Sequence, residues 1–254
     1  MKIKHLIYII SSIIPFSLYA QEKNDRFIEI MGSVGFSYYS GYPTFNTFDQ
    51  SLKDQGISGI DTSEADMPYG GLNAGAAAFY SIIKTDIGYP VIGAGFDYTY
   101  NVGHKSVDKY YNIGRTSSTK DGKSQSLFLD LYGGFNFTIF DRLNLFALAN
   151  FGYSIYDKAS QNEDFYYYNY SPIFIYEGHL TNDYNIKNHM KIGFSGIATY
   201  DLTEKVGIGA GLDINSHSFN ATGSTNYRAG AVKNIDLSAQ FTEVILKFIM
   251  SYSI

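Results

Sequence analysis

The sequence contains no cysteine and no tryptophan, and after residue 20 it contains no long apolar run. Without cysteine the chain cannot form a disulfide, a thiolate metal site, a thiol nucleophile or a lipoprotein anchor. A helix that crosses a membrane needs about 18 or more consecutive apolar residues. The nearest approach, from Val244 to Met250, is much shorter and is interrupted by Lys247. If this chain crosses a membrane it must cross as a closed β-barrel, because only helices and closed barrels pair every backbone polar group in lipid.

Basic residues are also in short supply, and the formal net charge of −5 argues against a nucleic-acid partner. Glycine and aromatic residues are abundant instead, with 25 Gly, 24 Tyr and 19 Phe among 254 residues. This combination is typical of a small membrane barrel, in which glycine allows tight packing of the lumen and aromatic side chains form girdles at the two interfaces.

The first twenty residues differ from the rest of the chain. Lys2 and Lys4 precede a mostly apolar run from Leu6 to Tyr19, and Ala20 offers a small residue for cleavage. This pattern predicts a secretory signal peptide over residues 1–20. The remaining residues, 21–254, suit a single β-domain.

The stretch from Met190 to Ser216 holds two runs of alternating residues, joined by the polar turn Asp201 to Lys205. A period of two is the signature of a strand, so the stretch predicts a β-hairpin. One face carries Ile, Val, Leu, Phe and Ala, whereas the other carries mostly Gly and Ser. A water-soluble barrel, the alternative, needs large apolar side chains inside and charged ones outside. The inverted pattern seen here is typical of a transmembrane barrel.

Similar alternation recurs along the chain. It predicts strands at about residues 27–38, 71–83, 91–101, 125–138, 143–154, 190–200 and 206–216, and from 237 to the end. Long connections are expected at 39–69, 102–124, 155–189 and 217–236, and they alternate with short turns. Outer-membrane barrels show this asymmetry between external loops and periplasmic turns. We therefore predict an all-β fold, a transmembrane antiparallel up-and-down barrel of eight strands, with both termini in the periplasm.

These features resemble those of the small eight-stranded outer-membrane barrels, namely the outer-membrane protein A barrel, the opacity proteins and the attachment/serum-resistance barrels. The last residues, Phe248 to Ile254, resemble the C-terminal strand that the barrel-assembly machinery recognises. That pattern usually ends in an aromatic residue, and here Tyr252 lies two positions before the end. The resemblance implies an outer-membrane location, contacts with outer-membrane lipids and lipopolysaccharide, the assembly machinery as a partner during insertion, a monomer, and no cofactor.

The interior of an eight-stranded barrel is just wide enough for side chains to fill it. Buried charges must be paired. We expect Lys191 to lie diagonal to Asp213, and Lys247 to meet Glu29 where the first and last strands close the barrel. The charged residues of the inner face have two interpretations: they form a structural salt-bridge network, or they form a gated ion path or proton relay. The alternation places these charged residues on the inner face: Glu29, Asp97, Asp130, Lys191, Asp213, Glu243 and Lys247.

The segment from Asp164 to Tyr170 is unusually rich in tyrosine. Tyrosine offers a large, rigid contact area at low entropic cost, which is why binding surfaces favour it. One hypothesis is a loop that binds an extracellular ligand or a host surface; the alternatives are a strand extension above the membrane and an outer aromatic girdle. The loop would present Phe165, Tyr166, Tyr167, Tyr168 and Tyr170.

The segment from Ser216 to Ala221 resembles the His-x-Ser-Asn stretch of the lipid A deacylase barrels, in which His is the base, Ser the nucleophile and a Glu orients the His. Glu243 is the candidate for the last role. However, Ser218 directly follows His217, and neighbours on a strand point to opposite faces. The other histidines after residue 20, His104, His179 and His189, have no metal-ligand spacing.

We therefore predict a non-catalytic outer-membrane protein with a structural or adhesin-like surface role. A lipid A-modifying acyl hydrolase and a narrow channel for ions or small solutes are the alternatives.

Overall fold

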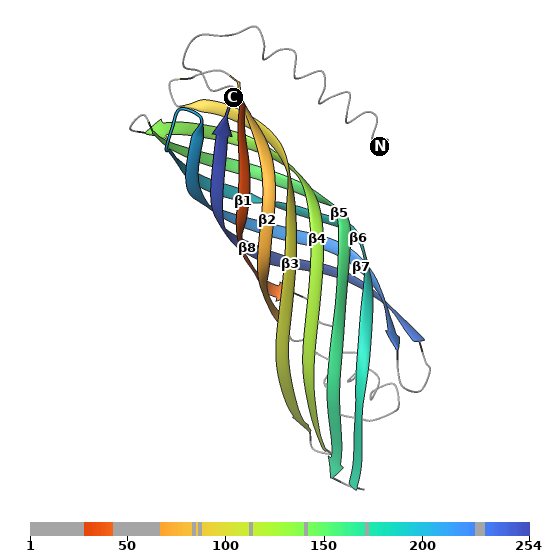
Figure 1. The fold of residues 1–254 in the computed structure, drawn as a ribbon. Helices are drawn as coiled ribbons and strands as arrows, with labels where there is room; N and C mark the ends of the chain where they lie inside the picture. The colour runs from red at the N-terminus through yellow and green to blue at the C-terminus, as the bar shows by residue number, and fades with distance from the viewer. Residues whose placement is uncertain are drawn as a thin grey trace.

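In the computed structural model, eight antiparallel strands close into one barrel in the order β1 to β8, and β8 pairs with β1 (Figure 1). The structure describes residues 28–42, 67–82, 85, 88–111, 114–139, 142–170, 173–226 and 232–254, so the predicted signal peptide lies outside the described residues. The strands are β1 (Ile28–Tyr42), β2 (Met67–Ser81), β3 (Tyr89–Tyr111), β4 (Gly114–Ile139), β5 (Leu143–Tyr170), β6 (Ile173–Asp201), β7 (Val206–Asn226) and β8 (Val232–Ser253). The predicted fold class is confirmed.

The two faces of the barrel wall alternate as the sequence predicts. Outward side chains such as Phe36 and Phe194 are mostly exposed, whereas inward neighbours such as Ser37 and Ser195 are buried. No helix among the described residues is long and apolar enough to cross a membrane. Exposed apolar side chains from all eight strands form a ring that we call the apolar belt: Ile30, Val34, Phe36, Leu72, Ile92, Phe96, Leu131, Phe135, Phe151, Ile192, Phe194, Leu212, Ile214, Leu246, Phe248 and Met250.

The strands are longer than predicted, at 15 to 29 residues. Three of the predicted long connections, at 102–124, 155–189 and 217–236, are mostly strand, so that prediction is wrong. The β3–β4 ladder runs to Tyr111↔Gly114, and the β5–β6 ladder runs to Tyr170↔Ile173. These segments lack the regular alternation of apolar and small residues that marks the other strands, which made them read as loops, but such strands are stable when neighbouring strands satisfy their backbone groups. The segment between β1 and β2, residues 43–66, lies outside the described residues.

Strands β3 to β6 run well past β1 and β2 at the end of the barrel opposite the C-terminus (Figure 1). We call the sheet formed there by residues 104–111, 114–121, 162–170 and 173–181 the strand extension. One of its faces is buried, with Phe165, Tyr167 and Leu180 almost inaccessible to solvent. The other face is exposed.

The lumen is filled at two levels by apolar side chains. The outer cluster lies toward the strand extension and consists of Tyr39, Tyr69, Phe219, Ala221, Ala239 and Phe241. The inner cluster lies toward the short turns and consists of Met31, Phe79, Val91, Phe146, Leu148 and Ile249. Charged and polar residues occupy the space between the two clusters.

The ladder between β5 and β6 is interrupted in the outer half of the barrel. Its pairing stops at Tyr153↔Met190 and resumes at Ala159↔Tyr184. We call the intervening segments, 154–158 and 185–189, the β5–β6 gap. Each contains one extra residue relative to its other neighbour: Ile155 relative to β4, and Asn188, with φ of 53°, relative to β7. The two bulges cancel, so the β5–β6 register is the same on both sides of the gap. Bulges re-aim side chains and are frequent near functional sites.

Candidate functional site

Two buried lysines bind carboxylates on other strands inside the barrel. The Nζ atom of Lys191 lies 2.7 Å from Oδ2 of Asp97 and 3.2 Å from Oδ2 of Asp130. The Nζ atom of Lys247 lies 2.7 Å from Oδ2 of Asp213 and 3.6 Å from Oδ1 of Asp97. Asn73 also donates to Asp97, at 2.6 Å. All seven charged residues predicted for the inner face are directed into the barrel, and five of them form one network.

The predicted partners within this network are wrong in two cases. Tyr200 pairs with Ile208, so Lys191 lies opposite His217 instead of diagonal to Asp213. Lys247 pairs with Gly35, six positions along β1 from Glu29, and does not reach that carboxylate. Asp97 on β3 lies across the narrow lumen from both lysines, a geometry that barrel closure creates, whereas Asp213 is a diagonal neighbour of Lys247 on the adjacent strand β7.

Gly152 makes room for the network. Its position on β5 faces the Lys191 side chain, and a methyl group there would collide with Oδ1 of Asp130 and would lie 2.6 Å from Cε of Lys191. The small residues predicted for the inner face therefore have a specific function at this point, which is to leave space for a buried ion pair.

A second chain of polar contacts, which we call the histidine relay, lies between this network and the outer cluster. Nδ1 of His189 is 2.8 Å from Oδ1 of Asp157, and Nε2 of His189 is 3.0 Å from Nδ1 of His217. Nε2 of His217 is in turn 2.9 Å from Oε2 of Glu243. The four side chains come from four strands, β5, β6, β7 and β8, and form three contacts in a line.

The relay is packed in aromatic rings. Phe241 stacks on His217 with ring centroids 4.6 Å apart and an angle of 8° between the planes. Phe128 meets both imidazoles edge-on. The ammonium group of Lys191 also contacts Phe128, at 4.5 Å from the centre of the ring. The imidazoles are therefore held away from bulk water, between the outer cluster and the lysine network.

Sequence reasoning missed Asp157 and His189, because both lie in the β5–β6 gap, inside a segment predicted to be a loop. The bulge at Asn188 turns the His189 side chain into the lumen, and a bulge breaks the period of two on which strand prediction depends. The contact between His217 and Glu243 was anticipated only through the resemblance to the deacylase barrels.

The arrangement does not match the deacylase pattern. His217 is fully buried inside the barrel, whereas Ser218 points to the outer face, as the alternation predicts. His217 and Glu243 converge in the lumen and not on the lipid-facing wall. Within the described residues, no three His, Asp or Glu side chains are placed to hold a metal ion.

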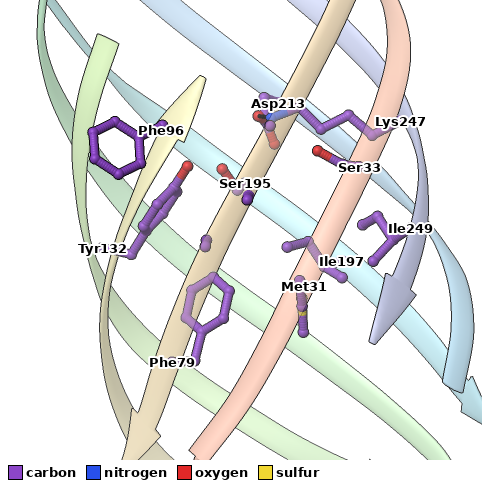
Figure 2. Close-up of a pocket in the computed structure, with 13 residues that line it drawn as sticks. Met31, Ser33, Phe79, Phe96, Tyr132, Ser195, Ile197, Asp213, Lys247 and Ile249 are labelled. Carbon is purple, nitrogen blue, oxygen red and sulfur yellow. Dashed lines mark ion pairs between the residues drawn. The ribbon is translucent and has the colours of Figure 1, made fainter. Parts of the chain in front are cut away.

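A small cavity separates the lysine network from the inner cluster. Figure 2 shows Asp213 and Lys247 directed toward one another on its polar side, with Ile197 and Ile249 on its apolar side. Its volume is ≈ 30 Å³. Ion pairs on one side of this cavity and the inner cluster on the other fill the described lumen.

The exposed face of the strand extension carries an aromatic patch near its end. Tyr110, Arg115 and Tyr168 are successive cross-strand neighbours on β3, β4 and β5. Arg115 lies over the Tyr110 ring at 5.2 Å and is 3.2 Å from Asp108. Hydrogen bonds from Ser117 and Arg115 hold the pKa of Asp108 below its ordinary value. We call this set, with Tyr166, the distal patch: Asp108, Tyr110, Arg115, Ser117, Tyr166 and Tyr168.

The tyrosine-rich segment is thus strand: the hypothesis of a loop is wrong, and the alternative of a strand extension is confirmed. Its ladder pairs are complete from Phe165↔Gly178 to Tyr170↔Ile173, and alternation divides its side chains between two faces. Phe165 and Tyr167 point to the buried face, whereas Tyr166 and Tyr168 point to the exposed one. The Tyr170 side chain lies outside the described residues.

Comparisons with known proteins give relatives in structure only. No family model and no curated protein matches the chain. The outer-membrane protease OmpT from Escherichia coli is 12% identical, with a TM-score of 0.51, and the match covers 94% of this chain and 100% of OmpT. Neisserial surface protein A is 12% identical, with a TM-score of 0.40, and the match covers 89% of this chain and 97% of that protein. OprG from Pseudomonas aeruginosa is 10% identical, with a TM-score of 0.38, and the match covers 92% of this chain and 99% of OprG.

The chain has the fold of an outer-membrane β-barrel. At 12% identity the likeness to OmpT shows the fold alone. In an outer-membrane barrel the apolar belt marks the wall that contacts lipid. The lysine network then lies inside the belt, and the histidine relay lies near its outer edge, where Tyr153 and Tyr156 are exposed. The strand extension lies beyond the belt, on the side away from the C-terminus.

Proposed function

We propose that this outer-membrane barrel is a non-catalytic surface protein whose strand extension binds a partner outside the cell. The observation that carries this proposal is the continuation of β3 to β6 beyond the apolar belt as a sheet with an exposed aromatic patch. In this orientation the short turns and the C-terminus face the periplasm, and the patch lies near the end of the described chain that is farthest from the membrane.

The filled lumen supports a surface role over transport. Two apolar clusters, a lysine network and the relay occupy the interior in succession. Ion pairs and hydrogen bonds that join several strands inside the barrel fix the relative positions of those strands, which suits a rigid support for an external binding surface. The network is therefore interpreted as structural.

The chemistry of the distal patch favours a protein partner. Tyr110 is 68% exposed, and Arg115 lies beside it, so an aromatic ring and a guanidinium are presented together. Tyrosine and arginine are enriched among the residues that dominate protein–protein binding energy. Because Asp108 balances Arg115, the patch carries no excess charge that would select a polyanion.

The test replaces Tyr110, Tyr166 and Tyr168 together by serine. Attachment of cells is measured on surfaces that are each coated with one extracellular-matrix protein. Cells that carry the wild-type protein should attach to at least one of these surfaces. On that surface the triple variant should lower attachment by about tenfold or more, which is the effect of removing central aromatic contacts. Attachment counts are compared with those of cells that lack the protein.

The matched control is Tyr156→Ser, which removes an exposed tyrosine from the same strand outside the patch. It should leave attachment unchanged. The proposal fails if wild-type cells attach no better than cells without the protein, or if the control lowers attachment as much as the triple variant does.

A further inference from the structure

The histidine relay needs one proton more than two neutral imidazoles supply. Ionised Asp157 accepts the Nδ1–H of His189, and ionised Glu243 accepts the Nε2–H of His217. In neutral imidazoles the two remaining nitrogens, Nε2 of His189 and Nδ1 of His217, would then both carry lone pairs. These nitrogens face each other at 3.0 Å. A hydrogen bond at that distance requires a third proton, shared between the two rings.

The carboxylates around the relay favour that proton, whereas the ammonium group of Lys191 opposes it. Between the two apolar clusters the described lumen holds five carboxylates, of Asp97, Asp130, Asp157, Asp213 and Glu243, against the two ammonium groups of Lys191 and Lys247. A proton on the imidazole pair offsets part of this excess of acid in a region where buried charge is costly. The titratable groups that face the relay or its neighbours are Tyr39 on β1, Tyr69 on β2, Asp97 on β3, Asp130 on β4, Asp157 on β5, Lys191 on β6, Asp213 on β7, and Glu243 and Lys247 on β8.

The relay also replaces a missing part of the barrel wall. In the β5–β6 gap the backbone ladder is open, and the contact between Asp157 and His189 joins the two strands instead. His217, at the centre of the relay, stacks on Phe241 of the outer cluster. Loss of the shared proton would bring two lone pairs together, and this would loosen both the gap and the outer cluster.

We propose that the relay is a pH-sensitive latch: a single proton bound between His189 and His217 holds the outer half of the barrel closed, and its loss as the pH rises opens the β5–β6 gap. The proton exchanges with the medium outside the cell, since the Asp157 side chain is 8% exposed whereas that of Glu243 is 1% exposed. The inner apolar cluster separates the relay from the opposite side. This property is independent of any partner that binds the distal patch.

The test uses the full-length protein in lipid nanodiscs, with ¹⁵N-labelled histidine observed by NMR from about pH 5 to about pH 9, the range in which histidine titrates. We expect His189 and His217 to lose one proton in a single joint step. Across the same step, hydrogen–deuterium exchange in residues 154–158 and 185–189 should rise roughly tenfold after correction for the intrinsic pH dependence, which corresponds to the loss of hydrogen bonds to charged groups.

Two variants separate the latch from a merely structural role. His217→Phe keeps a ring that can stack on Phe241 and removes the shared proton, so the step in exchange should disappear. Asp157→Asn leaves the imidazole pair intact and removes a charge that favours the proton, so the step should move to lower pH. The second variant tests the proposal even if the first fails to fold.

The control is His179→Gln, which changes an exposed histidine that pairs with Asp164 at 2.6 Å on the strand extension. It should leave the step unchanged. Two independent imidazole titrations, exchange that does not follow the joint step, or a step that persists in His217→Phe or is lost in His179→Gln would each overturn the proposal.

Discussion

Lys191 is the residue on which the buried charges depend most. It binds Asp97 and Asp130 together, and its stem lies against Gly152 in the lumen. A buried ion pair contributes little net stability compared with apolar side chains, but removing one partner leaves the other charge buried and uncompensated. In this network, removal of one lysine affects two carboxylates at once.

We expect Lys191→Met, which keeps most of the side-chain volume, to lower the free energy of unfolding by about 3–5 kcal/mol. Urea unfolding in lipid vesicles measures the change. Lys205→Met, in the exposed turn between β6 and β7, is the matched control and should stay within about 0.5 kcal/mol of wild type. If Lys191→Met proved as stable as the control, the network would not be what fixes the strands relative to one another.

At the scale of the strand, the two bulges of the β5–β6 gap form one feature. Ile155 is an extra residue on β5, Asn188 is an extra residue on β6, and the pairing between β5 and β6 resumes in the same register because the insertions are matched. A shift of one residue would turn every side chain beyond the gap to the opposite face. The strand extension therefore depends on both bulges being present, or on both being absent.

This dependence predicts a compensating pair of deletions. Removing Ile155 alone, or Asn188 alone, should put β5 and β6 out of register beyond the gap and unfold the strand extension. Removing both should restore a continuous ladder. Hydrogen–deuterium exchange of residues 159–170 and 173–184 measures the outcome, with fast exchange in each single deletion and slow exchange in the double. Equal exchange in the three variants would show that the bulges act independently.

The sequence predicts the strands inside the apolar belt well, and their connections poorly. Apolar side chains that alternate with glycine and serine identify which residues face inward, so Asp97 and Lys191 could be assigned to the lumen from sequence alone. Their pairing could not, because it depends on a register set by which residue of β7 faces Tyr200. The polar strands beyond the belt, and the bulges that place Asp157 and His189, lack the period on which the prediction relies.

At the scale of the whole molecule, the barrel is a wall around a filled interior. An eight-stranded barrel is just wide enough for its own side chains, and here Phe79 and Phe146 meet across the inner level at 5.8 Å between ring centroids. The cavity beside Phe79 has a volume of ≈ 30 Å³. A hydrated ion would have to displace aromatic side chains at two levels and break the lysine pairs between them.

We therefore expect the purified protein to produce no steady conductance in planar lipid bilayers at neutral pH. A variant in which Phe79, Phe146 and Phe241 are all replaced by alanine should show intermittent current, because it removes aromatic rings from both clusters and leaves mainly the lysine pairs in the path, whereas Phe146→Ala alone should stay silent because the outer cluster is intact. Current is recorded for each protein after insertion has been checked by the heat-dependent shift of the folded barrel on a gel. A wild-type conductance that disappears in Lys191→Ala would contradict this expectation and would make the buried charges an ion path, since a structural network has no reason to carry current.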